Sequence, residues 1–459
     1  MKKILIALLI MSRMPAIAQT WSMDSCISYA LTHSNDLRRA CIDRQQSGDD
    51  VKTSRLDFLP TVQGQVSGQY AWGRNIDPET NTYNTITTFN NYYTVEASIA
   101  LFDGGQTINA FHRAKNARAQ AETTLQKAGD DKAIAVMTKF VDAVYTQKSV
   151  VLAEEKLNDS QALLHKTQRL FELGEKSRPD VVQVESQVAE DDYSLLHQKN
   201  QAHLALLALK AEMNYPTTDT LYLAGCEPGI LPLTTGQLLA ENSKLLSNDA
   251  TPHGPHNVEI AEQHAEDLKY AWKLQRADLL PRLTLGGGLQ TSYYRNISQG
   301  RGTANGFGSQ FRNNLGEYVY LSLSIPIFTP SRWRSARRAK SEWQKALLDV
   351  DDAQRKLNDD FAQATADCNG YRSEVAQMKK KVDADSLAYY LSRRKYEEGM
   401  LSTFDLHAAS QTLLQSRIKL LQMQLLYAMK QRLVAYYEGQ PLFRAEITTL
   451  LSFNKYANR

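Results

Sequence analysis

The sequence has little cysteine, little net charge and no long apolar run after its start, and each shortage excludes a class of protein. Four cysteines without CxxC spacing argue against the common zinc and redox motifs. A formal net charge of +3 on 459 residues, with no Lys/Arg-rich cluster interleaved with stacking aromatics, argues against a nucleic-acid binder. Beyond the N-terminus no stretch approaches the roughly 20 apolar residues of a transmembrane helix. The 42% hydrophobic content is nevertheless enough to bury a core.

Motifs of catalysis are also missing. The sequence contains no nucleophile elbow, no phosphate-binding glycine loop and no HExxH pattern. The HGPH stretch at 253–256 could bind a metal, but in a Pro/Gly loop such a stretch is far more often plain surface. We therefore predict no enzymatic activity, no cofactor and no metal.

Residues 1–18 have the pattern of a secretory signal peptide, in which two lysines precede an apolar run and a small-x-small cleavage site follows. In an exported protein Cys26 and Cys41 could pair, provided that the helices around Ser34 form a hairpin. The alternative is two separate thiols that pack as small hydrophobes.

The chain repeats itself. RLFELGEKSRPDVV is answered by RKYEEGMLSTFDLH, so that Gly174 aligns with Gly399 and Asp180 with Asp405. RLDFLPTV likewise answers RADLLPRL, and SIALFDGG answers SIPIFTPS, at nearly the same offset. The sequence therefore predicts a tandem duplication of a unit of roughly 200 residues, too long for an ordinary solenoid repeat.

Each half contains two strand-like segments that follow a Leu-Pro pair. In these segments apolar residues alternate with uncharged Gln, Ser and Thr. Polar loops from about 75 to 91 and from about 297 to 315 are expected to separate the two strands of each half. The strands are predicted at 61–74, 92–102, 282–296 and 317–328.

The alternation favours membrane strands over a soluble sandwich, whose strands also alternate. A strand of about 10 residues is long enough to cross a bilayer when tilted, and an uncharged polar face suits a wetted lumen. Four strands cannot close a barrel, and open sheet edges cannot face lipid. The chain must then oligomerise, and three copies would give a twelve-stranded barrel.

Two long helical segments, 106–171 and 332–396, follow the strand pairs with almost no interior Gly or Pro. At 1.5 Å per residue each would span roughly 100 Å. Apolar residues recur at coiled-coil spacing, which predicts rods with a narrow seam. Gly174 and Gly399 end the rods at tight hairpin tips. Return helices are predicted at 180–214 and 403–438.

The predicted organisation thus has five segments. A signal peptide precedes two repeats, which an inter-repeat segment joins and a C-terminal tail follows. Each repeat consists of a helix, two strands, a long helix and a return helix. In chain order the segments cover 1–18, 19–214, 215–256, 257–440 and 441–459.

In the order and duplication of these parts the chain resembles the TolC-like outer membrane efflux protein family over essentially its whole mature length. The Leu-Pro pairs, the SIALFDGG and SIPIFTPS joints and the Gly-x-x-Ser-x-x-Asp tips carry the resemblance. The resemblance implies an α+β membrane protein that forms a homotrimer. Its twelve-stranded β-barrel would lie in the outer membrane of a Gram-negative-type envelope, continued by a coiled-coil helical barrel in the periplasm. Its implied partners are a periplasmic adaptor and an inner-membrane transporter, which open a closed tip.

The resemblance also implies a gate. In the family, the tyrosine three before the second tip glycine links to the aspartate six after the first, and these positions hold Tyr396 and Asp180. The aspartate of the family's constricting acidic ring matches Asp405. Two positions depart from the family, because Leu401 stands in place of a basic residue and Ala408 in place of an acidic one. The tips expected to dock the adaptor contain Gly174, Ser177, Gly399 and Ser402.

Three Asp405 carboxylates brought near one axis would attract cations and disfavour the passage of anions. Alternatively, Asp180 and Asp405 only complement the dipole at the N-terminus of a returning helix.

A basic cluster follows the last predicted strand. SRWRSARRAK, at 331–340, crowds arginines into a helix N-terminus, where the helix dipole disfavours positive charge. We expect the cluster to contact anionic lipid headgroups at the periplasmic face of the outer membrane, with a solvated charge run as the alternative. The expected membrane-interface residues are Trp333, Arg332, Arg334, Arg337 and Arg338.

Only an exit duct accounts for strands and rods together. A passive porin would explain the strands alone, and a structural coiled coil or adhesin the rods alone. The predicted function is therefore the passive outer membrane channel of a tripartite efflux or export system, gated at its periplasmic tip. The outer membrane component of type I protein secretion is the alternative, and the sequence leaves the cargo open.

Overall fold

The computed structural model describes residues 20–77, 81–224, 255–298 and 306–442. The expected signal peptide, Cys226, His253 and most of the inter-repeat segment and C-terminal tail lie outside these residues. The chain divides into two compact units, which we call the sheet unit and the hairpin unit. The sheet unit comprises Ile42–Thr123 and Val258–Asp352, and the hairpin unit Met1–Cys41, Thr124–Asn257 and Ala353–Arg459.

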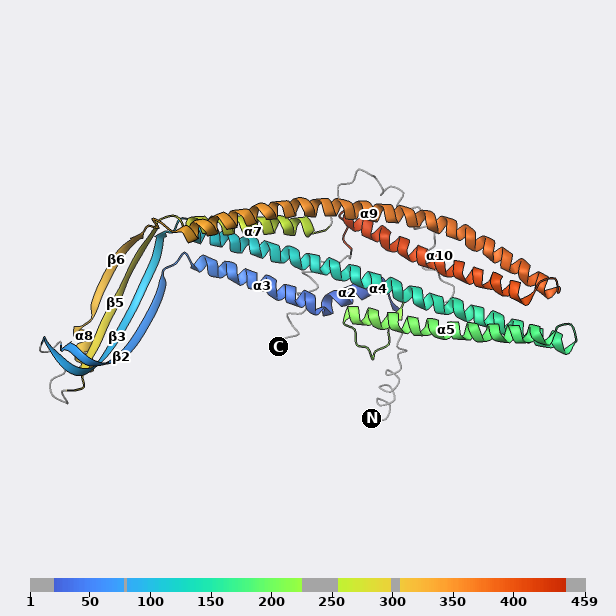
Figure 1. Ribbon diagram of the computed structural model, residues 1–459, viewed down its shortest axis with the longest axis horizontal. Helices are drawn as coiled ribbons and strands as arrows, with labels where there is room; N and C mark the ends of the chain where they lie inside the picture. The colour runs from blue at the N-terminus through green and yellow to red at the C-terminus, as the bar shows by residue number, and fades with distance from the viewer. Residues whose placement is uncertain (1–19, 78–80, 225–254, 299–305, 443–459) are drawn as a thin grey trace, which may run out of the picture. The chain divides into compact units, whose positions relative to one another are not determined.

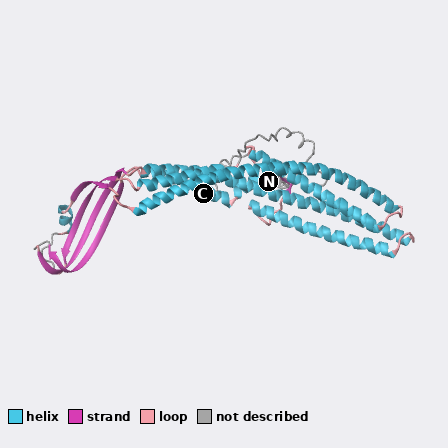
Figure 2. Cartoon of the chain, turned by 45° about the horizontal axis from the view of Figure 1, so that its top comes forward, coloured by secondary structure: helices cyan, strands magenta, loops and turns pink. Residues whose placement is uncertain are grey.

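The sheet unit contains one four-stranded antiparallel sheet (Figure 2). The strands lie in the order β2-β3-β5-β6, so each of them pairs with the next strand of the sheet along the chain. This arrangement leaves β2 and β6 at the two edges. The strands are β2 (Thr61–Asp77), β3 (Thr82–Phe102), β5 (Arg282–Asn296) and β6 (Gly316–Ser324).

Large apolar side chains of the sheet stay exposed in the single chain. Val62 and Val66 are exposed on β2, and Val319, Leu321 and Leu323 on β6. These residues recur at every second or fourth position, so on each strand they share one face. Val319 keeps 81% of its surface accessible, whereas the inner face of a soluble sandwich would be covered by a second sheet. The exposure pattern suits an apolar face turned to lipid.

The first expected loop is mostly strand. The predicted loop from 75 to 91 was wrong because β3 begins at Thr82 and pairs with β2 as far as Asp77. The stretch is polar, but its Thr and Tyr residues are good strand formers. Pairing with β2 also satisfies its backbone N–H and C=O groups, so composition alone misjudged this region.

The second expected loop, 297–315, contains a short helix, α8 (Phe307–Asn313). Phe307 packs edge-on against Tyr93 and Tyr293 of the sheet, with ring centroids 6.1 and 5.4 Å apart. These aromatic contacts hold α8 against the sheet.

The last strand is shorter than predicted, since β6 ends at Ser324 and not at 328. Pro326 has no N–H to donate to a strand ladder, so pairing stops before it. The following helix begins at Pro330, where proline suits the first turn because that N–H has no partner in any case.

Two long helices each turn back into a shorter one (Figure 1). We call α4 (Gln106–Glu172) with α5 (Arg178–Met213) the first hairpin, and α9 (Pro330–Glu397) with α10 (Thr403–Tyr437) the second. None of the helices that the structure describes combines the length and the apolar run that crossing a membrane requires.

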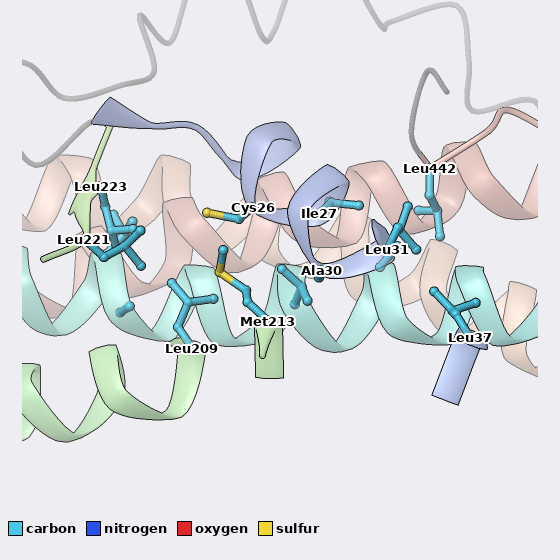
Figure 3. Packing of buried hydrophobic residues seen from close by; sticks show 14 of the residues in the cluster. Cys26, Ile27, Ala30, Leu31, Leu37, Leu209, Met213, Leu221, Leu223 and Leu442 are labelled. Carbon is cyan, nitrogen blue, oxygen red and sulfur yellow. The ribbon is translucent and has the colours of Figure 1, made fainter. Parts of the chain in front are cut away.

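The main core of the hairpin unit joins α2 (Met23–His33) to the first hairpin (Figure 3). Cys26, Ile27 and Leu31 of α2 pack in one cluster with Leu209 and Met213 of α5. A two-residue parallel pairing of β1 (Thr20–Trp21) with β4 (Tyr222–Leu223) extends this cluster. The remaining helices are α3 (Asn35–Leu56) and α7 (Asn257–Ala277).

The cysteines of this core are not bonded to each other. Cys26 and Cys41 form no disulfide, so the pairing that the sequence left open is not made. Burial raises the pKa of Cys26 to about 12, which keeps it a protonated, inert thiol in the core.

Candidate functional site at the hairpin tips

The first hairpin turns through a glycine in the left-handed region. Gly174 has a φ of +81°, and the N–H groups of Gly174 and Glu175 donate to the carbonyls of Phe171 and Leu170, each at 2.9 Å. These bonds satisfy the last carbonyls of α4 and end the helix. There is room for a Cβ at position 174, but any L side chain would be strained at this φ.

A reciprocal cap then begins α5. The N–H and the hydroxyl of Ser177 both donate to Oδ2 of Asp180, at 3.0 and 2.7 Å. The bond from the hydroxyl, and then the one from the N–H, hold the pKa of Asp180 below its usual range. The Asp180 carboxylate is therefore occupied within its own turn.

The second tip repeats the first. Gly399 has a φ of +76°, and its N–H donates to the Tyr396 carbonyl at 3.0 Å. The hydroxyl of Ser402 donates to Asp405 Oδ2 at 2.6 Å and accepts from the Asp405 N–H at 3.1 Å. The duplicated sequence thus folds into duplicated turns, each with the same glycine, serine and aspartate roles.

Tyr396 links the two hairpins. Its side chain is 1% exposed, and its hydroxyl shares a 3.0 Å hydrogen bond with Oγ1 of Thr167 on α4. The ammonium of Lys176, in the first tip, lies 4.5 Å from the centroid of the Tyr396 ring. A buried hydrogen bond and a cation–π contact therefore join α9 to both the rod and the turn of the first hairpin.

The link between Tyr396 and Asp180 that the family resemblance implies is not formed within the single chain, where both side chains have other partners. Tyr396 bonds Thr167, and Asp180 bonds Ser177. The cap uses the carboxylate, and the buried phenol bonds the threonine hydroxyl. Local sequence patterns could not single out Thr167, which lies 229 residues from Tyr396. Lys176 belongs to the first tip motif, but Leu401 stands at the matching position of the second, so the repeat did not mark it.

The tips also present apolar side chains to solvent. Leu173, Met400 and Phe404 are each more than half exposed, and Asp405 is exposed among them. Such a surface suits the docking of another protein. Within the described part of the chain no group of His, Cys, Asp and Glu is arranged to hold a metal ion.

The predicted membrane-interface residues lie in the sheet unit, in the first turns of α9. Arg332 donates to the Asp278 carbonyl at 2.8 Å, and Trp333 is 58% exposed. Arg334, Arg337 and Arg338 are exposed, and none of these three has an ion-pair partner among the described residues. Two exposed apolar residues, Ile327 and Phe328, precede the cluster. The charges therefore lie next to an apolar surface on one stretch of chain.

Taken together, the sheet with its exposed apolar face and the long helical hairpins with their matching tips fit a membrane channel protein. The model of the outer membrane efflux protein family matches residues 26–214 and 256–437, so the chain belongs to that family. The match confirms the resemblance seen in the sequence. The protein is an outer membrane exit channel with its helical portion in the periplasm.

Two curated relatives match most of the chain. The alkaline protease secretion protein AprF of Pseudomonas aeruginosa is 22% identical, over 84% of this chain and 78% of AprF. The proteases secretion protein PrtF of Dickeya chrysanthemi is 19% identical, over 89% of this chain and 86% of PrtF.

Solved structures share the fold. The outer membrane protein VceC of Vibrio cholerae matches with a TM-score of 0.74 at 15% identity, covering 91% of this chain and 96% of VceC. The open state of the MtrE outer membrane channel of Neisseria gonorrhoeae matches with a TM-score of 0.70 at 18% identity, covering 92% and 90%. These likenesses confirm the predicted fold class.

Removing the Tyr396 hydroxyl should loosen the tips. Tyr396→Phe deletes the bond to Thr167 but keeps the ring beneath Lys176, so we expect a loss of about 1 kcal/mol of tip stability. Hydrogen exchange of the tip segments would measure it. Tyr390→Phe is the matched control, because Tyr390 is an exposed tyrosine of the same helix that also lies beneath a cation, Arg394. Equal exchange in the two variants would contradict the role of the buried bond.

Proposed function

We propose that the chain works as a homotrimeric exit duct, closed at its hairpin tips and opened by a periplasmic adaptor together with an inner-membrane transporter. The observation that carries this proposal is the link between hairpins at Tyr396, placed beside two matched tips. The hydrogen bond and the cation–π contact are each weak, and the neighbouring Lys166–Glu397 ion pair, 3.3 Å long and partly exposed, adds little, so a docked partner can break the link. The duct itself supplies no energy and needs no cofactor.

The sheet supports the trimer. Its outer strands β2 and β6 have no further neighbour in the four-stranded sheet, and open edges in lipid would leave N–H and C=O groups unsatisfied. Copies of the chain provide the missing neighbours, and three copies supply twelve strands. The exposed apolar tip residues are then the docking surface for the adaptor.

The native mass of the detergent-extracted protein tests the assembly. We expect a trimer whose circular dichroism is mainly helical with a minor β component, and which conducts ions in a planar bilayer. A stable monomer without conductance would overturn the duct, because four strands alone cannot close a pore.

A second candidate is a duct for secreted polypeptide. Both curated relatives described above are protease secretion proteins, which favours protein export over small-molecule efflux. The tunnel has the same construction in either case, so the transporter that docks would decide the cargo.

We also propose that Asp405 forms the acidic ring of the closed tip. Asp405→Asn keeps an acceptor for the Ser402 hydroxyl and removes only the charge, so we expect a several-fold drop in the cation-to-anion permeability ratio. Reversal potentials in a salt gradient measure this ratio. Asp192→Asn, an exposed carboxylate of α5, is the control and should change it little. An unchanged ratio in the Asp405 variant would mean that this carboxylate only caps its helix.

Finally, we propose that the basic cluster of α9 rests on anionic headgroups. The Arg337→Gln and Arg338→Gln double variant should bind vesicles containing anionic lipid more weakly, by about 1 kcal/mol per lost charge. The control changes Lys379 and Lys380, two exposed cations of the same helix, to Gln. Co-flotation with vesicles at several salt concentrations gives the affinities. Equal binding of both variants would show that the cluster is only solvated.

A further inference from the structure

An ion pair is buried inside the first hairpin, between α4 and α5. Nζ of Lys156 on α4 lies 2.8 Å from Oδ1 of Asp191 on α5, and the two side chains are only 8% and 1% exposed. Gln187 donates a second bond to the same carboxylate oxygen at 2.8 Å. The other oxygen, Oδ2, has no hydrogen-bond partner in the described structure. Burying two charges is costly, and this pair is incompletely satisfied.

Residues of the second hairpin share a cavity with this ion pair. A cavity of about 320 Å³ is lined by Lys156 and Asp191 from the first hairpin and by Thr403, Leu406 and His407 from α10. Oγ1 of Thr403 and Nδ1 of His407 are buried, and neither has a hydrogen-bond partner among the described residues. Polar atoms of both hairpins therefore meet in one cavity without completing each other's bonds. One added charge would therefore destabilise the packing of the two hairpins around this cavity.

His407 is the group in this cavity whose charge changes near neutral pH. Burial, and then the Lys156 ammonium, lower its pKa, while Asp191 and Glu190 raise it less. A neutral imidazole is therefore favoured when the hairpins are packed. The other charged or titratable groups that line the cavity are Asp159 and Lys166 of α4, and Tyr389, Arg393 and Glu397 of α9.

We propose that Lys156, Asp191 and His407 form a latch that holds the two tips together while His407 is neutral and releases them when it binds a proton. Protonation places a second cation beside Lys156, with one buried carboxylate to serve both. Separating the hairpins hydrates the imidazolium and removes that conflict. The latch rests on the proposed gating at the tips, and it makes acid a second opening signal besides the adaptor.

The direction of the pH effect follows from the lowered pKa. Well above the ordinary histidine pKa of about 6.5, His407 is neutral whether the tips are packed or apart, and the latch is fully present. As the pH falls through that value, a separated His407 gains a proton that a packed one resists. Packing therefore loses stability as the pH falls from about 6.5 toward the lowered pKa.

Hydrogen exchange of the full-length protein in detergent tests the latch without relying on conductance. Between about pH 7.5 and about pH 5.5, after correction for intrinsic exchange, the tip segments around positions 180 and 405 should lose protection several-fold. His407→Gln should keep its protection at the lower pH. His203→Gln is the control, because His203 is exposed on α5, and it should behave like the unchanged protein.

A second variant guards against misfolding of the first. Asp191→Asn leaves the Lys156 cation buried without a carboxylate, so its tips should already be unprotected at neutral pH. If the unchanged protein and His407→Gln respond alike to acid, the latch is wrong even where the channel conducts. Acid-dependent protection through His407 in a protein that forms no conducting trimer would instead uphold the latch and overturn the proposed duct.

Discussion

The need to satisfy every backbone N–H and C=O group in lipid constrains this structure more than any other interaction. One chain builds four strands, of which β2 and β6 lie at open edges. Water would satisfy those edges in a soluble protein, but hydrocarbon does not. The same sheet exposes a face of valine and leucine that is suited to contact with lipid. Edges and face together leave the isolated chain incomplete in a membrane, which is the physical reason for proposing that copies of the chain assemble.

The two tips have the same backbone turn, but the aromatic side chains beside the turns make different contacts. Both repeats use glycine, serine and aspartate in the same roles, so the backbone turns alike. The aligned positions Phe171 and Tyr396 have diverged. Phe171 is 39% exposed and has no hydroxyl, whereas Tyr396 is buried and bonded to the first hairpin. Duplication therefore produced two hairpins with the same turn. Divergence at one aromatic position then allowed Tyr396 of the second hairpin to bond the first.

Polar groups buried between the hairpins make the stability of their contact sensitive to charge. An apolar interface would be more stable, but it would contain no charged or titratable group that an opening signal could alter. Lys156, Asp191, Thr403 and His407 instead leave several polar atoms incompletely bonded in one cavity. In the gating proposed above, such a contact orders the tips and is weak enough for a docked adaptor or a proton to release.

The sequence by itself determined the duplication, the alternating strands, the long rods and the turns at Gly174 and Gly399, because these features depend on local periodicity and backbone conformation. It misjudged 75–91 and the end of β6, where pairing with β2 and the missing N–H of Pro326 override composition. Only the tertiary structure decided that Tyr396 bonds Thr167 and that Lys156 meets Asp191 beside His407. Those partners lie on different helices, and no local sequence pattern specifies which faces of the long helices pack against each other.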